Sequence, residues 1–103
     1  LELDQAFRKA GVPLTADQYR LMNLLWTRDG GHQEYYARKL GRDRSAVTRM
    51  IQLLEQEGYL TRLADQGDQR AKKVALTPKG WDLQPMAEAC ANDILLKMWE
   101  GFM

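Results

Sequence analysis

The 103-residue sequence has one cysteine, one histidine and no long hydrophobic run. A lone cysteine excludes an intrachain disulfide framework, and without a Cys-X-X-Cys pair or a Cys/His cluster nothing indicates zinc. No apolar stretch reaches the roughly 18 residues that a membrane-spanning helix needs, and the N-terminus lacks the pattern of a signal peptide. We therefore expect a protein of the reducing cytoplasm, with no membrane contact, no metal site and no cofactor.

The same scarcity leaves few options for catalysis. The sequence has no serine–histidine–aspartate order, no glycine-rich loop to cradle a phosphate and no cluster of metal ligands. Its histidine, His32, lacks partners at metal-ligand spacing and is interpreted as a surface residue. We therefore predict no catalytic residues.

Positive charge is present but unevenly distributed. The net charge is only +1, which by itself does not indicate nucleic acid. Residues 38–49 contain five basic residues and one acidic residue, residues 62–73 contain four and two, and residues 82–103 contain one and four. Such a local concentration is what phosphate binding requires. Charge alone fits a solvated surface equally well.

Capping signals predict helices through the first half of one domain. Residues 2–10 are expected to be helical up to Gly11. A capping box formed by Thr15 and Gln18 begins the next helix. A short helix over about residues 33–40 is closed by Gly41, which suits the left-handed conformation.

The following helix has two chemically different faces. Asp43 is its expected N-cap and Gly58 ends it. The apolar positions recur at three- and four-residue spacing and define a buried face, made of Val47, Met50, Ile51 and Leu54. The opposite face is polar and consists of Arg44, Ser45, Thr48, Arg49 and Gln52.

Two short strands follow, over residues 60–64 and 73–76, and flank a polar tip that includes Gly67. The order is therefore helix, turn, helix and β-ribbon. Such a helix pair can place its second helix in the DNA major groove with the ribbon beside it. Arginine and glutamine can bind guanine and adenine edges, and serine and threonine can bind bases or phosphates. The alternative is an ordinary exposed polar face.

The C-terminal part predicts a helix with an unusually broad apolar surface. Thr77 is the expected N-cap with Pro78 in the first helical position, and Pro85 allows either a kink or a restart. The apolar positions that follow cover more of the helix surface than the single stripe that one small domain can bury. They are Met86, Ala87, Cys90, Ala91, Ile94, Leu95, Met98, Trp99 and Phe102. This excess predicts a partner helix, most simply from a second copy of the chain.

The middle of the chain resembles the MarR family of bacterial transcription regulators. The resemblance is carried by Leu40-Gly41, Asp43-Arg44-Ser45, Val47-Thr48-Arg49, Leu54-Glu55, Gly58, Asp65, Asp68-Gln69-Arg70 and residues 74–80. It implies a winged helix-turn-helix, an α+β fold that is mostly α, with a two-stranded wing and a long C-terminal dimerisation helix. It also implies a homodimer through the terminal helices.

Roles for individual residues follow from that resemblance. The polar face over residues 44–52 would enter the major groove. In the wing, Arg70 would approach the minor groove and Asp68 would help to hold the wing's shape. Lys72 and Lys73 are expected to bind phosphates, and Arg38 and Lys39 are expected to contact the DNA backbone.

Family members are usually longer, so we divide the chain into three parts. Residues 1–14 would be the remnant of an N-terminal dimerisation helix, residues 15–80 the DNA-binding domain, and residues 81–103 a dimerisation helix that is incomplete. The expected function is a DNA-binding repressor that a small aromatic or phenolic effector releases. The alternative is a winged-helix docking module that binds protein and not DNA.

Two further features have open interpretations. Four aromatic residues can line an effector pocket or, more commonly, belong to the core: Trp26, Tyr35, Tyr36 and Trp81. Cys90 is interpreted as a small hydrophobic residue of the helix, because no motif marks it as an oxidant-sensing thiol.

Overall fold

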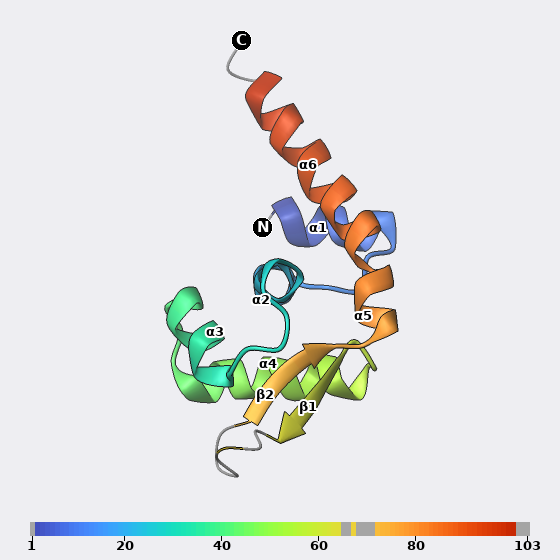
Figure 1. The fold of residues 1–103 in the computed structure, drawn as a ribbon. Coiled ribbons are helices and arrows are strands. Elements are labelled where there is room, and N and C mark those ends of the chain that lie inside the picture. Colours follow the sequence, from blue (N-terminus) through green and yellow to red (C-terminus); the bar gives the residue numbers. More distant parts are fainter. Residues whose placement is uncertain (1, 65–66, 68–71, 101–103) are drawn as a thin grey trace.

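The computed structural model describes residues 2–64, 67 and 72–100. It is a mostly helical winged helix-turn-helix, as predicted (Figure 1). The elements are α1 (Glu2–Ala10), α2 (Ala16–Thr27), α3 (Gln33–Leu40), α4 (Arg44–Gln56), β1 (Leu60–Ala64), β2 (Lys72–Leu76), α5 (Pro78–Asp82) and α6 (Gln84–Glu100).

Local capping explains where the helices begin and end. The Thr15 hydroxyl accepts a hydrogen bond from the Gln18 amide at 3.1 Å, and the Gln18 side chain accepts one from the Thr15 amide at 3.0 Å. Asp43 caps α4 by accepting from the Ala46 amide at 3.0 Å. Gly41 closes α3 in the left-handed region, with φ of 65°. These boundaries confirm the predicted ones. They could be predicted because each capping signal involves residues within a single turn of the chain.

The core lies between α2, α3, α4 and the β-ribbon. Val47, Ile51 and Leu54 are buried on the inner face of α4, whereas Met50 is only partly buried at its edge. The ribbon contributes Leu60, Val74 and Leu76, and α2 contributes Leu21, Met22 and Leu25. Burying this apolar stripe fixes the rotation of α4 about its own axis, so its polar face must point outward.

The wing sheet has an additional backbone pairing, along β2, that the sequence did not predict. β1 and β2 pair antiparallel, from Leu60 opposite Leu76 to Ala64 opposite Lys72. His32 forms an isolated bridge with Lys73, and the Val74 amide donates to the Gly31 carbonyl at 2.9 Å. The segment before α3 is thereby attached to the base of the wing. Lys72 is the first residue of β2 and not part of the tip, one residue earlier than predicted.

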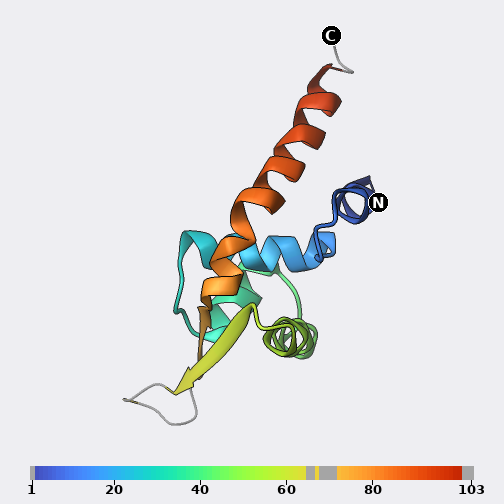
Figure 2. The same ribbon diagram turned by 90° about the vertical axis from the view of Figure 1, so that its right-hand side faces the viewer.

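Pro85 marks a restart of the C-terminal helix. Thr77 caps α5, with the Gly80 amide donating to its hydroxyl at 3.1 Å. α5 ends at Asp82 and α6 begins at Gln84. The lower part of α6 lies beside α1, and the rest projects away from the other elements (Figure 2). Leu95 and Leu96, on the projecting part, are 62% and 61% exposed. None of the helices within the described ranges is both long and apolar enough to cross a membrane.

Candidate nucleic-acid interface

The outward face of α4 presents the predicted polar set. The outward face of α4, as the term is used below, consists of Arg44, Ser45, Thr48, Arg49 and Gln52. Thr48 is partly buried and the other four residues are exposed. The buried Val47, Ile51 and Leu54 lie on the other side of the same helix. The helical pattern thus predicted the orientation of this face correctly, and its role in binding remains a prediction.

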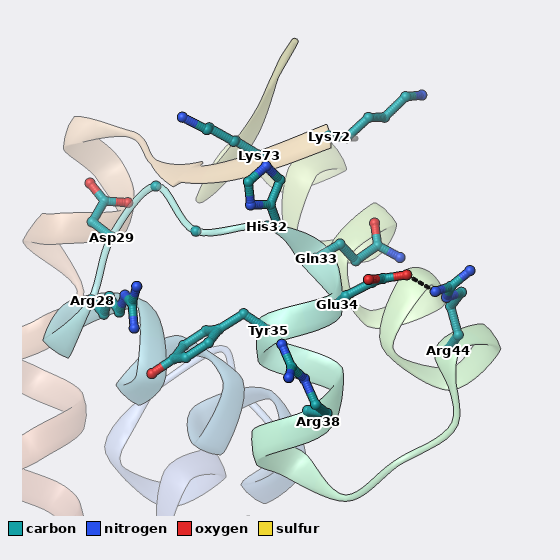
Figure 3. Close-up of a pocket in the computed structure, with 12 residues that line it drawn as sticks. Arg28, Asp29, His32, Gln33, Glu34, Tyr35, Arg38, Arg44, Lys72 and Lys73 are labelled. Carbon is teal, nitrogen blue, oxygen red and sulfur yellow. Dashed lines mark hydrogen bonds and ion pairs between the residues drawn. The ribbon is translucent and has the colours of Figure 1, made fainter. Parts of the chain in front are cut away.

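The first turn of α3 contacts the outward face of α4. The Gln33 side-chain amide donates a hydrogen bond to the Thr48 hydroxyl. The Glu34 carboxylate forms an ion pair with the Arg44 guanidinium (Figure 3). Sequence reasoning missed both Gln33 and Glu34, because nothing in a short polar helix start reveals which neighbour it touches. Arg44, which we predicted as a groove contact, is paired with Glu34 in the free protein.

The turn between α3 and α4 also carries an engaged arginine. The Arg42 guanidinium lies 2.9 Å from the Asp17 carboxylate on α2, and both side chains are about half exposed. Two of the five basic residues over residues 38–49 therefore face carboxylates. The basic surface at α4 is consequently less positive than the sequence count suggested.

A basic depression of about 990 Å³ lies between α3, β2 and the loop before α3. Figure 3 shows Lys72 and Lys73 on one side of it, Arg28 and Arg38 on others, and the Glu34–Arg44 pair at its edge. The residues that line it are Arg28, Asp29, Gly30, Gly31, His32, Gln33, Glu34, Tyr35, Arg38, Arg44, Lys72 and Lys73. The structure thus brings together three predicted phosphate contacts, Arg38, Lys72 and Lys73. Arg28 joins them and was not predicted.

Tyr35 organises two of the cations near the basic depression. The Arg28 guanidinium carbon lies 4.5 Å from the centre of the Tyr35 ring, and the Lys39 ammonium lies 5.8 Å from it. Such cation–π contacts favour a cation over the ring face and restrain its position. Lys39, a predicted contact to the DNA backbone, therefore lies next to the depression because it contacts Tyr35, but it is not among the lining residues.

Fewer basic side chains of the wing lie on the described surface than the sequence predicted. Asp68 and Arg70 lie outside the described residues, so their predicted roles are not tested. Arg62 was counted with the basic ribbon, but its side chain is only 18% exposed, and its Nε lies 3.7 Å from the Glu55 carboxylate on α4. Its Nε and one terminal nitrogen are buried with no hydrogen-bond partner among the residues the structure describes. The Arg62 side chain is therefore largely buried near Glu55 and does not add to the exposed basic surface.

The four candidate pocket aromatics are dispersed over different environments. Trp26 and Tyr36 are buried in the core, Trp81 is 41% exposed on α5, and Tyr35 lines the basic depression. The Tyr36 hydroxyl donates to the Arg28 carbonyl at 2.6 Å and accepts from the Gly31 amide at 2.8 Å. Burial raises the pKa of Tyr36, and the hydrogen bond from Gly31 offsets part of that rise. The core interpretation holds for Trp26 and Tyr36, and these four residues do not form one pocket in the described structure.

Cys90 and His32 lie where the sequence predicted. Cys90 is partly buried and packs against the core, as expected for a small hydrophobic residue. His32 is exposed, in agreement with its interpretation as a surface residue. Within the described ranges, no group of three or more His, Cys, Asp or Glu side chains is placed to hold a metal ion.

Comparison with known proteins identifies the family. The MarR family model matches residues 14–72, which is more than half of the chain. Over 75 residues the chain is 32% identical to YybA, an uncharacterised HTH-type transcriptional regulator of Bacillus subtilis. That alignment covers 73% of this chain and 50% of YybA, so the chain spans half the length of that relative.

Solved structures extend the similarity over the whole fold. A MarR transcriptional regulator from Methanosarcina mazei Go1 is 29% identical with a TM-score of 0.87, covering 98% of this chain and 71% of that one. CouR from Rhodococcus jostii RHA1, solved with p-coumaroyl-CoA, is 27% identical with a TM-score of 0.81, covering 96% of this chain and 68% of that one. With the family match and the observed winged helix, these similarities mean that the chain belongs to the MarR family of regulators.

Proposed function

We propose that the chain binds double-stranded DNA sequence-specifically as a homodimer and regulates transcription. The observation that carries this proposal is the outward face of α4, which is polar and largely exposed and whose first residue, Arg44, lines the basic depression. The buried Val47, Ile51 and Leu54 hold the helix in one orientation. A rigid helix with an exposed polar face suits the major groove, which admits one α-helix.

The side chains of this face have the chemistry of base and phosphate contacts. Arg44 and Arg49 match the O6 and N7 acceptors of guanine, and Gln52 matches the N6 and N7 edge of adenine. Ser45 and Thr48 can bind either bases or phosphates. We assign base contacts to Arg49 and Gln52 first, because both are exposed over the middle of α4.

Phosphate contacts are assigned to the margin of the basic depression. Lys72 is exposed at the start of β2, and Lys73 and Arg38 line the same depression. Such contacts fix the register of a protein on DNA without reading its sequence. Arg70 and Asp68 keep the wing roles that family resemblance assigns to them.

Dimerisation is assigned to the terminal helices, residues 1–14 and 81–103. Met86, Leu95 and Leu96 are between 43% and 62% exposed on α6, which leaves apolar surface for a second copy to cover. A two-fold dimer would require a near-palindromic site with half-sites about 10 base pairs apart. The protein should therefore sediment as a dimer at micromolar concentration.

The regulatory mode is proposed to be repression relieved by a small aromatic or phenolic effector. The complex of the related CouR with p-coumaroyl-CoA supports this class of ligand. No enzymatic activity is assigned, since the family is one of regulators and the polar groups of α4 suit binding.

The proposal is tested by titrating the protein with random-sequence duplex DNA at low and at moderate salt, followed by selection from a random duplex pool. A DNA-binding regulator retains phosphate-driven binding that weakens steeply with salt, and it enriches a near-palindrome. A docking module that binds only proteins shows almost no binding even at low salt. That second result would overturn the proposed function.

A further inference from the structure

One ion pair on the proposed DNA-binding surface has no evident role in holding the fold together. The Glu34 carboxylate, in the first turn of α3, pairs with the Arg44 guanidinium at the start of α4 (Figure 3). The two side chains are 67% and 70% exposed. An exposed pair of this kind contributes little to folding stability, because water and salt screen it.

The pair is held in place by a second contact. Gln33, the residue before Glu34 in α3, donates a hydrogen bond from its side-chain amide to the hydroxyl of Thr48, one turn further along α4 than Arg44. Two neighbouring residues of α3 thus contact two residues on the outward face of α4. The two helices are kept in register at this point, so Glu34 remains within reach of Arg44.

The two carboxylates that line the basic depression have different partners. The depression is lined by five basic residues and two acidic ones. The carboxylate of Asp29 accepts a hydrogen bond from the Leu76 amide at 2.8 Å and so anchors the end of β2. The Glu34 carboxylate is instead directed to Arg44.

We propose that Glu34 is a specificity-determining residue that lowers binding to non-specific DNA by occupying Arg44. This inference rests on the proposed function. On random DNA, Arg44 would have to leave a carboxylate to reach a phosphate, so the exchange gains little. At a matched site a guanine edge accepts two hydrogen bonds from the fork, which compensates for the separation. Glu34 therefore lowers the affinity for random DNA more than the affinity for the matched site, and so raises the ratio of specific to non-specific affinity.

The test compares Glu34→Gln with the parent on a random duplex and on the duplex that selection enriches. Glutamine keeps the size of the side chain and removes its charge, which releases Arg44 for one additional phosphate. Binding to the random duplex should tighten roughly five- to tenfold at moderate salt, and its salt slope should steepen by about 0.9 per protomer. Binding to the enriched site should change less, so the specificity ratio falls.

Two further variants isolate the effect. Glu57→Gln makes the same change of net charge at the exposed end of α4, away from its outward face and from the residues that line the basic depression, and it should leave both affinities as in the parent. In an Arg44→Ala background, Glu34→Gln should no longer affect the random duplex. Thermal melts should show that the Glu34→Gln variant is folded like the parent.

Three results would overturn the inference. The first is a Glu34→Gln variant that binds the random duplex as the parent does. The second is an effect of Glu34→Gln that persists without Arg44, and the third is equal weakening on both duplexes. Failure of the parent itself to bind any duplex at low salt would instead overturn the proposed function, and the inference with it.

Discussion

The indole nitrogen of Trp26 donates a hydrogen bond to the carbonyl oxygen of Gly80 at 3.1 Å, between residues that are 54 apart in the sequence. Trp26 lies near the end of α2, and Gly80 lies in α5 at the root of α6. Both residues are buried. This bond joins the helix-turn-helix core to the segment that carries the proposed dimerisation helix.

Replacing Trp26 by Phe should therefore lower stability. The buried Gly80 carbonyl would lose its donor, and an unsatisfied buried acceptor costs about 1–3 kcal/mol. Trp81→Phe is the matched control, because Trp81 is 41% exposed, and it should change the free energy of unfolding by at most about 0.5 kcal/mol. Urea unfolding of both variants provides the comparison. Equal stabilities would contradict a structural role for the Trp26–Gly80 bond.

Gly80 should also resist replacement by Ala. A Cβ built on Gly80 would lie 2.2 Å from the backbone carbonyl oxygen of Tyr59, so either α5 or the backbone just before β1 must move. Overpacking of this kind costs about 1–3 kcal/mol, which exceeds the helix propensity that Ala gains over Gly, about 1 kcal/mol. Asp82→Ala, exposed on the same helix, is the control. A Gly80→Ala variant more stable than the parent in urea would show that the contact relaxes easily.

The helices and strands were predictable because their signals are local. The capping box at Thr15, the cap at Asp43 and the left-handed Gly41 each act within a few residues of the chain. The inward and outward faces of α4 also followed from its period, since burying one apolar stripe fixes the rest. The bridge between His32 and Lys73 was missed because it depends on how a distant loop meets the wing.

The charges at the candidate site could be counted but not assigned. Arg42 pairs with Asp17 on α2, Arg44 with Glu34 on α3, and Arg62 packs toward Glu55. Each pairing depends on the packing of separate helices and strands, which a linear charge count does not contain. The charge count therefore located the basic segments but could not show which of their cations face carboxylates on other elements.

The tyrosines predict a loss of stability in alkaline solution. Burial raises the pKa of Tyr36 above its ordinary value, and likewise those of Tyr19 and Tyr59. Because the tyrosines of the unfolded chain lose their protons from about pH 10, before those of the folded protein, deprotonation favours the unfolded state. The contribution of these tyrosines to the free energy of unfolding is therefore fully present below that pH and is lost as the pH rises further. In urea melts at about pH 8 and about pH 11, Tyr36→Phe should lose less stability between the two conditions than the parent. An equal loss would exclude Tyr36 as a contributor.

Lys72 should act on all DNA sequences alike. Its side chain is exposed beside the basic depression, and a phosphate contact carries no sequence information. Lys72→Ala should weaken binding to random and enriched duplexes by a similar factor and reduce the salt slope by about 0.9 per protomer. Titrations at several salt concentrations measure both quantities. A changed base preference would instead place Lys72 at a base edge.

Arg49 and Ile51 provide the sharpest test, because they lie two residues apart on opposite sides of α4. Arg49 is exposed, whereas Ile51 is fully buried. Arg49→Ala should change the free energy of unfolding by at most about 0.5 kcal/mol. It should cost roughly 1–3 kcal/mol of DNA-binding free energy per lost bidentate contact and relax the base preference at one base pair in each half-site. Ile51→Ala should cost about 2–5 kcal/mol of stability and leave the preferred sequence of the folded fraction unchanged. Denaturant melts and titrations against matched and single-mismatch duplexes measure the two effects together. If Arg49→Ala bound the enriched site as tightly as the parent, the major-groove assignment of the outward face of α4 would be wrong.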